Sequence, residues 1–141
     1  MDFKNLANQY KDELLHNVLP FWLQNSQDKE FGGYFTCMDR EGKVFDTDKF
    51  VWLQGREVWM FSMLYNKVEK RQEWLDCAVQ GGEFLKKYGH NGEYNWYFSL
   101  DRLGRPLVEP YNIFSYTFAA MAFGQLSLAT GNQEYADIAR K

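Results

Sequence analysis

Three residues of the stretch Val51–Tyr65 have the types and the spacing to bind a negatively charged group. Read as a helix, this stretch places Trp52, Arg56 and Trp59 on one face, at spacings of four and three. A guanidinium keeps its positive charge, offers planar paired donors and stacks on aromatic rings. Two interpretations fit the pattern: Arg56 is paired inside a packed core, or it faces a cavity that needs a fixed positive charge. Arg56 is therefore the first candidate for a functional residue.

The composition indicates one globular domain. The 141 residues are 45% hydrophobic and 18% aromatic, which suffices for a packed core and argues against disorder. The net charge of -3, with Lys and Arg scattered along the chain, argues against a nucleic-acid surface. No apolar run approaches the ~20 residues of a membrane helix, and the N-terminus is charged, unlike a secretory signal. Cys37 and Cys77 stand apart and indicate buried thiols in a reducing compartment, so we expect a cytoplasmic protein.

The elements that must position Arg56 are helices separated by short hairpins. Apolar residues at a spacing of four predict a first helix, which Pro20 should kink or end. Aromatic and β-branched residues around the DREG and DRLG sequences predict two hairpins. Gly131 suits the position after the fourth helix. The expected helices are 2–24, 72–88, 112–130 and 133–141, together with one that carries Arg56, is capped by Thr47 or Asp48 and runs to about residue 66. The expected hairpins are 32–45 and 97–107.

The chain contains an internal repeat. The sequences YFTCMDREGK, from Tyr34, and YFSLDRLGR, from Tyr97, share the pattern YF[ST] followed by DRxG[KR]. QEWLDCA, from Gln72, and QEYADIA, from Gln133, match at a separation of 61 positions. The repeat unit is therefore hairpin, helix, connector and helix. Units of this kind bury their apolar faces only by stacking on neighbours.

The repeat also predicts that the chain is cut short. Lys141 corresponds to Gln80, which lies inside the third predicted helix, so the last helix ends without a cap or stop signal. A closed ring of helix pairs needs about 200 residues. We therefore expect residues 1–141 to be the N-terminal part of a longer helical toroid, truncated at its C-terminal end. The alternative is a short open solenoid, which should end in a polar capping helix.

The segment from Phe21 to Asn66, which includes WLQGREVWM, closely resembles the N-terminal region of the N-acylglucosamine 2-epimerases, the family that includes renin-binding protein. Gly81–Leu85 (GGEFL) and Ile113–Gly131 fit the same pattern, so the resemblance covers essentially the whole chain. The GG-aromatic block also occurs in the related cellobiose epimerases and aldose–ketose isomerases. The resemblance implies an all-α fold: one partial domain, 1–141, that forms the N-terminal part of an (α/α)6 barrel, with short β-hairpins between helix pairs.

The resemblance further implies an isomerase that interconverts N-acetylglucosamine and N-acetylmannosamine. A base removes the C2 proton of the open-chain sugar, an acid returns a proton on the opposite face, and the enediolate between these steps needs positive charge or hydrogen-bond donors. In the family, an inner-helix arginine that matches Arg56 holds the reactive oxygens, and two later histidines are the acid and base. Neither His16 nor His90 matches those histidines. We therefore expect the chain alone to be inactive.

The further candidates for contact with the sugar are Trp52, Phe114, Ser115, Tyr116 and Tyr34. Aromatic faces can stack on a sugar ring, and hydroxyl tips can bond to its hydroxyl groups. Trp52 lies one turn before Arg56, and Phe114 is its equivalent in the repeat, 62 positions later. For each of these candidates a packing role in the core is the alternative.

The sequence favours neither a metal nor a required cofactor. Its carboxylates lack metal-ligand spacing, and the glycine pairs Gly32–Gly33 and Gly81–Gly82 are too short for a phosphate loop. Some family members respond to ATP as an activator, so the resemblance leaves ATP open as an allosteric ligand, and it implies an amino-sugar substrate and pairing as a homodimer. Two rival functions remain: an aldose–ketose isomerase or cellobiose 2-epimerase with the same proton transfer, and a non-enzymatic helical-repeat binding protein.

Overall fold

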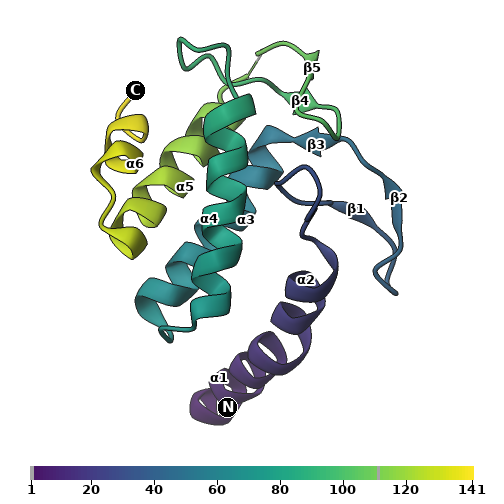
Figure 1. Ribbon diagram of the computed structural model, residues 1–141. Helices are drawn as coiled ribbons and strands as arrows, with labels where there is room; N and C mark the ends of the chain where they lie inside the picture. The colour runs from purple at the N-terminus through teal and green to yellow at the C-terminus, as the bar shows by residue number, and fades with distance from the viewer. Residues whose placement is uncertain (1, 111) are drawn as a thin grey trace.

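The computed structural model describes residues 2–110 and 112–141, which form helices with short antiparallel strands at one end (Figure 1). The helices are α1 (Phe3–Glu13), the π-helical segment η1 (Leu14–Val18), α2 (Leu19–Asn25), α3 (Val51–Lys67), α4 (Gln72–Tyr88), α5 (Phe114–Thr130) and α6 (Gln133–Ile138). The strands are β1 (Cys37–Met38), β2 (Val44–Asp46), β3 (Lys49–Phe50), β4 (Ser99–Leu100) and β5 (Pro106–Val108). Both predicted hairpins and the existence of every predicted helix are confirmed. Two helix ends were predicted wrongly: α3 is preceded by Phe50 without a side-chain cap from Thr47 or Asp48, and α6 ends at Ile138.

The first predicted helix is one rod with an irregular middle, made of α1, η1 and α2. Asp2 caps its start by accepting hydrogen bonds from two backbone N–H groups of the first turn. Pro20 stands in the first turn of α2, immediately after the π-helical segment. Proline cannot donate the helical hydrogen bond of that turn, and a π-bulge is one of the ways in which a helix absorbs such an interruption. Pro20 thus does not end the helix, which continues to Asn25, and the irregularity lies in the segment before it.

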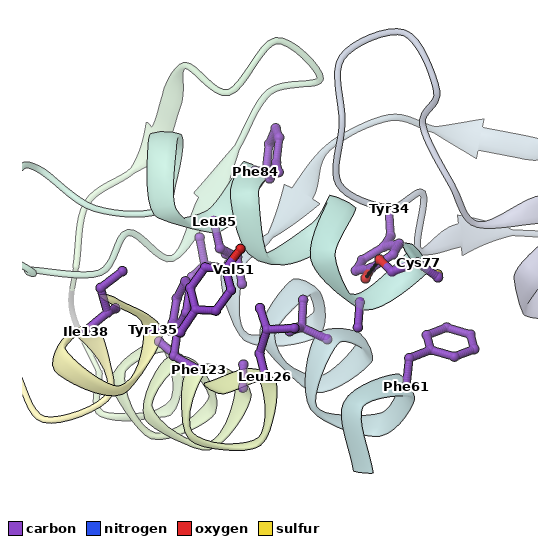
Figure 2. Packing of buried hydrophobic residues seen from close by; sticks show 14 of the residues in the cluster. Tyr34, Val51, Phe61, Cys77, Phe84, Leu85, Phe123, Leu126, Tyr135 and Ile138 are labelled. Carbon is purple, nitrogen blue, oxygen red and sulfur yellow. Dashed lines mark hydrogen bonds between the residues drawn. The ribbon is translucent and has the colours of Figure 1, made fainter. Parts of the chain in front are cut away.

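The core lies where α3, α4 and α5 pack together (Figures 1 and 2). The fully or almost fully buried apolar side chains include Val51, Phe61, Trp74, Leu85, Phe123 and Leu126. Phe123 of α5 also contacts Trp96 and Tyr135, with ring centroids 5.7 and 5.9 Å apart, so aromatic contacts connect the second hairpin region, α5 and α6. This core fixes α3, the helix that carries Arg56, on the sides where it faces α4 and α5.

The two hairpins repeat each other in geometry as well as in sequence. The registers are Cys37↔Asp46 and Met38↔Val44 in the first, and Ser99↔Val108 and Leu100↔Pro106 in the second, with the irregularity at the same place. Asp39 and Asp101 each accept backbone N–H groups two and four residues later. Gly42 and Gly104 both have a φ of 86°, a conformation that favours glycine. The predicted repeat is thus confirmed.

A buried ion network holds the loop after α2 against β3 and the second hairpin. The Lys49 ammonium, at the start of β3, is fully buried and donates to Asp28 Oδ2 at 2.9 Å and to the carbonyl oxygens of Gly32 (2.6 Å) and Arg102 (2.9 Å). Arg102 in turn donates to both Asp28 oxygens, at 2.9 and 3.1 Å. Burial alone would raise the pKa of the Asp28 carboxyl, but the hydrogen bonds from Arg102 and Lys49 outweigh it and lower the pKa to about 2.

Candidate active site

Four consecutive residues of α3, Gln54 to Glu57, each contact a different part of the molecule. Successive residues of an α-helix point ~100° apart, so one turn can reach the loop before β1, α5, an open cavity and the end of α2 in order. The side chain of Gln54 is fully buried and clamps the backbone of Tyr34: its Oε1 accepts from the Tyr34 N–H at 2.7 Å, and its Nε2 donates to the Tyr34 carbonyl at 2.8 Å. The clamp fixes the loop that follows Gly32–Gly33 beside α3.

Gly55 allows α3 and α5 to approach each other closely. A Cβ at this position would lie 2.9 Å from the carbonyl oxygen and 3.0 Å from the carbonyl carbon of Phe118 on α5. These are backbone atoms, which cannot turn aside as a flexible side chain can. The glycine of the WLQGR sequence therefore sets the helix separation that places its neighbour, Arg56.

We expect Gly55→Ala to destabilise the protein by about 1–3 kcal/mol, because α3 and α5 must move apart to admit the methyl group. Gly124→Ala is the matched control, since Gly124 is also a helical glycine but has open space where its Cβ would lie. Its substitution should stabilise the protein by about 0.5–1 kcal/mol. Urea unfolding of the two variants measures both effects, and equal stabilities would contradict the close-approach explanation.

Arg56 lines a cavity of about 410 Å³ between α2, the loop before β1 and α3. The residues around it are Trp22, Thr36, Leu53, Arg56, Glu57, Trp59 and Met60. Arg56 is exposed, and its side chain forms no hydrogen bond or ion pair with the residues described by the structure. The buried hydroxyl of Thr36 also has no hydrogen-bond partner among those residues. The cavity thus combines apolar walls with an unpaired guanidinium and an unpaired hydroxyl, which suits a small polar ligand that carries or develops negative charge.

Two of the predicted sugar contacts are wrong. The Tyr34 side chain is fully buried, and its hydroxyl donates to the carbonyl oxygen of Cys77 at 2.7 Å (Figure 2). Gly81 leaves the space for that hydroxyl, because a Cβ there would lie 2.2 Å from it. Tyr34 is therefore a core residue. Ser115 is also buried, with 1% of its surface exposed, and offers no surface to a ligand.

The other three predicted contacts lie apart from the Arg56 cavity. Trp52 is half-buried against Phe118, with ring centroids 5.9 Å apart. Phe114 is 61% exposed at the start of α5. Tyr116 lines a different hollow and donates its hydroxyl hydrogen to Asn95 Oδ1 at 3.3 Å. Within this chain, Arg56 is thus accompanied by Trp59 in place of Trp52, and contact of these three residues with a sugar remains a prediction.

The two histidines also lie outside the cavity. His16 is exposed in η1, with its Nδ1 3.1 Å from the carbonyl oxygen of Asp12. His90 stacks on Tyr94 at a centroid distance of 4.6 Å and meets the edge of Trp96, and burial lowers its pKa. Neither histidine reaches Arg56, in agreement with the sequence analysis, which gave them no catalytic role.

The architecture and this cavity can now be compared with known proteins. The sequence profile of N-acylglucosamine 2-epimerase (GlcNAc 2-epimerase) matches residues 33–141, which include α3 and its Gln54–Glu57 turn. The chain belongs to the N-acylglucosamine 2-epimerase family. The chain is 44% identical over 128 residues to the N-acylglucosamine 2-epimerase of Mus musculus and 45% identical over 125 residues to that of Homo sapiens. These alignments cover 88% and 86% of the chain but only 30% and 29% of the two relatives.

A solved member of a related group has the same fold. The cellobiose 2-epimerase from Bacillus thermoamylovorans B4167 superimposes with a TM-score of 0.88 at 29% identity, over 97% of this chain and 35% of that one. Cellobiose 2-epimerases are (α/α)6 barrels, so the helix pairs of the chain form part of such a barrel, as predicted. Within the described ranges, no helix is long and apolar enough to cross a membrane.

Sequence reasoning missed three polar residues at or beside the cavity: Glu57 and Thr36 line it, and Gln54 clamps the loop that carries Thr36. A signal for Gln54 and Glu57 was present, since each is a polar residue within an otherwise apolar stretch of helix. Thr36 carried no such signal, because a threonine in a short hairpin is ordinary. Its proximity to α3 follows from the Gln54 clamp on Tyr34, which only the structure reveals.

Proposed function

We propose that the protein carrying this chain interconverts N-acetylglucosamine and N-acetylmannosamine by removing and returning the C2 proton, with Arg56 holding the reactive oxygens. The observation that supports this most directly is the unpaired guanidinium at the wall of a cavity built by the Gln54–Glu57 turn. The Mus musculus and Homo sapiens relatives, which are 44% and 45% identical to the chain, are N-acylglucosamine 2-epimerases, and this supports the same choice of sugar.

The chemistry explains why an arginine suits this position. Loss of the C2 proton from the open-chain sugar gives an enolate, whose negative charge lies on the C1 oxygen because C2 carries the acetamido nitrogen. A guanidinium remains ionised and offers paired, coplanar N–H donors, one of which can bind this oxygen while the other binds a neighbouring polar group of the sugar. Such a donor favours the enolate over the neutral sugar, and this difference is what accelerates the reaction.

The proposal places the acid and base outside residues 1–141. Neither His16 nor His90 reaches the Arg56 cavity, and Glu57 lies in it as a buried carboxyl bonded to Ser26. The chain spans about 30% of the relatives that it matches. We therefore include in the proposal that residues 1–141 are the N-terminal part of a longer barrel, and that the chain on its own does not turn over sugar.

The test is the exchange of the C2 proton in heavy water. The full-length protein, incubated with N-acetylmannosamine, should produce N-acetylglucosamine with deuterium at C2, as followed by proton NMR. The isolated chain should produce neither the epimer nor the deuterated sugar. The proposal is refuted if the full-length protein leaves both N-acetyl sugars unlabelled and unconverted.

The structural likeness to cellobiose 2-epimerase favours one alternative, an epimerase or aldose–ketose isomerase that acts on unacetylated sugars. The proton transfer and the role of Arg56 would be the same, and only the pocket would differ. Cellobiose and mannose assayed beside N-acetylmannosamine decide between them: turnover confined to the unacetylated sugars supports the alternative.

Four further expectations form part of the proposal. No cofactor is required, ATP is a candidate allosteric activator, a homodimer is the candidate assembly, and the protein resides in the cytoplasm. The last expectation agrees with two free thiols, Cys37 and Cys77, although Cys37 is only half-buried and not buried as the sequence suggested. Activity with and without ATP and chelator, together with the mass in solution, tests the first three.

A further inference from the structure

The residue after Arg56 is a buried glutamate that no ion pair compensates. Glu57 is 6% exposed and lines the same cavity as Arg56. Its Oε1 lies 2.5 Å from Oγ of Ser26, a fully buried residue at the end of α2. Among the residues that the structure describes, no salt bridge includes Glu57. Burying a charged carboxylate without a cation costs desolvation free energy, so the protonation state of Glu57 has to be established.

The two short contacts of the Ser26 hydroxyl indicate that the Glu57 carboxyl carries a proton. The Ser26 hydroxyl lies within hydrogen-bond distance of two oxygens, Glu57 Oε1 at 2.5 Å and the carbonyl oxygen of Trp22 at 2.7 Å. A serine hydroxyl has one proton, and a backbone carbonyl can only accept. If Ser26 donates to Trp22, the proton of the shorter contact must come from the Glu57 carboxyl. An ionised Glu57 would leave one of two short oxygen–oxygen contacts without a proton.

The groups that face Glu57 from other elements do not favour a negative charge. From the loop before β1 comes Tyr34, from α4 comes Cys77, and from α2 come Ser26 and the carbonyl of Trp22. Burial raises the pKa of both Tyr34 and Cys77, so both remain neutral. On α3 itself, Arg56 lines the same cavity without pairing to Glu57.

We propose that Glu57 is a positioning residue for Arg56 that works as a neutral acid, donating its carboxyl proton to Ser26 and so fixing α3 to the end of α2 while leaving Arg56 without an internal counter-ion. The role rests on the proposed function, because Arg56 must be free to receive the negative charge of the sugar. An ionised Glu57 would place a competing carboxylate in the wall of the same cavity and would break the hydrogen-bond chain to Trp22.

The pH at which this arrangement fails follows from the same burial. Burial raises the pKa of Glu57 from an ordinary 4.5 to about 8. Since the folded state holds the proton more tightly than the unfolded chain, folding is most favoured below about pH 4.5 as far as Glu57 is concerned. This contribution declines as the pH rises and is lost through about pH 8.

The experiment compares wild type with Glu57→Gln in the full-length protein. Glutamine is similar in size, stays neutral and retains an N–H donor for Ser26. We expect similar kcat/KM values near neutral pH, and a wild-type to variant ratio that falls about tenfold per unit above about pH 8. Taking the ratio removes the titration of the acid and base, which both proteins share. Glu41→Gln, an exposed glutamate in the first hairpin, is the matched control and should follow the wild type.

Infrared spectroscopy gives a readout that does not need activity. The difference spectrum between wild type and Glu57→Gln at neutral pH should contain the carbonyl stretch of a protonated carboxylic acid, which disappears on titration through about pH 8. A carboxylate band at neutral pH, or a constant activity ratio across the alkaline range, overturns the proposal. If the wild type turns over no sugar, the proposed function fails, and the positioning role of Glu57 toward Arg56 fails with it. The infrared band of the protonated carboxyl would still be present in that case, so the two failures can be distinguished.

Discussion

Replacing Arg56 with alanine should lower kcat/KM of the full-length protein by about 10²–10³-fold, the usual cost of losing one preorganised donor to a developing oxyanion. The guanidinium is exposed and forms no hydrogen bond or ion pair with the described residues, so its loss should change the free energy of unfolding by less than about 0.5 kcal/mol. A large catalytic effect with almost no structural effect distinguishes a functional arginine from one that supports the core. Steady-state kinetics and urea unfolding of the same preparation measure the two quantities.

Two further variants sharpen this test. Arg56→Lys retains the charge but loses the planar pair of donors, and we expect its activity to fall between those of wild type and Arg56→Ala. Arg40→Ala removes an exposed arginine from the first hairpin and should leave the kinetics unchanged. Wild-type turnover in Arg56→Ala would show that this residue has no part in the mechanism, and the cavity would lose the main evidence for its function.

Replacing Asp28 with asparagine should destabilise the protein by about 3–5 kcal/mol, since it leaves the fully buried Lys49 ammonium without the one carboxylate that pairs with it among the described residues. Lys49→Met should cost less, because Arg102 still pairs with Asp28 through two hydrogen bonds. Glu30→Gln is the matched control: Glu30 pairs with Arg102 but is 64% exposed, and its loss should cost less than about 1 kcal/mol. The order of the three unfolding midpoints checks the argument, and it fails if Glu30→Gln is the most damaging.

The pH dependence of the same variants follows from the lowered pKa of Asp28. Because the folded protein keeps this carboxyl ionised down to about pH 2, its contribution is complete above an ordinary carboxyl pKa of 3.8 and is lost as the pH falls toward 2. The wild type should lose about 2 kcal/mol from this group over that range. Asp28→Asn should show a correspondingly shallower acid slope in urea unfolding.

Helical periodicity and the turn sequences were sufficient to predict most of the fold. The spacing of apolar residues identified α3, α4 and α5, and the paired DRxG sequences identified two equivalent hairpins. The pairing of β3 with β4 was not foreseen, because Lys49–Phe50 is a two-residue strand whose partner lies far along the chain. The ion network around Lys49 could not be predicted either, since Asp28 is 21 residues away in the sequence and the Arg102 carbonyl that Lys49 also binds is 53 residues away.

Of the predicted site residues, Arg56 lines a cavity, whereas Tyr34 and Ser115 are buried in the interior. Arg56 was found because a charge inside an apolar helix must have a reason, and its cavity confirms that it does not lie paired inside the core. Tyr34 was assigned to the mouth because it follows two glycines, but the Gln54 clamp and the space at Gly81 draw it into the interior. The repeat identified Phe114 as the equivalent of Trp52, but it did not show which face of either helix contacts a ligand.

The duplicated hairpins suggest how such a protein can evolve. The turns at Asp39 and Asp101 match in backbone geometry. The clamp, the close approach, the guanidinium and the acid of Gln54–Glu57 occur in the first copy only, since α5 has Tyr-Thr-Phe-Ala at the four corresponding positions. Ancestral doubling would have supplied a scaffold, and specialisation then needed to alter a single helical turn. The shared scaffold and the residues of the candidate site are thus separable. Exchanging the hairpin turns at Asp39 and Asp101 between the two copies should be tolerated, whereas exchanging α3 and α5 should not.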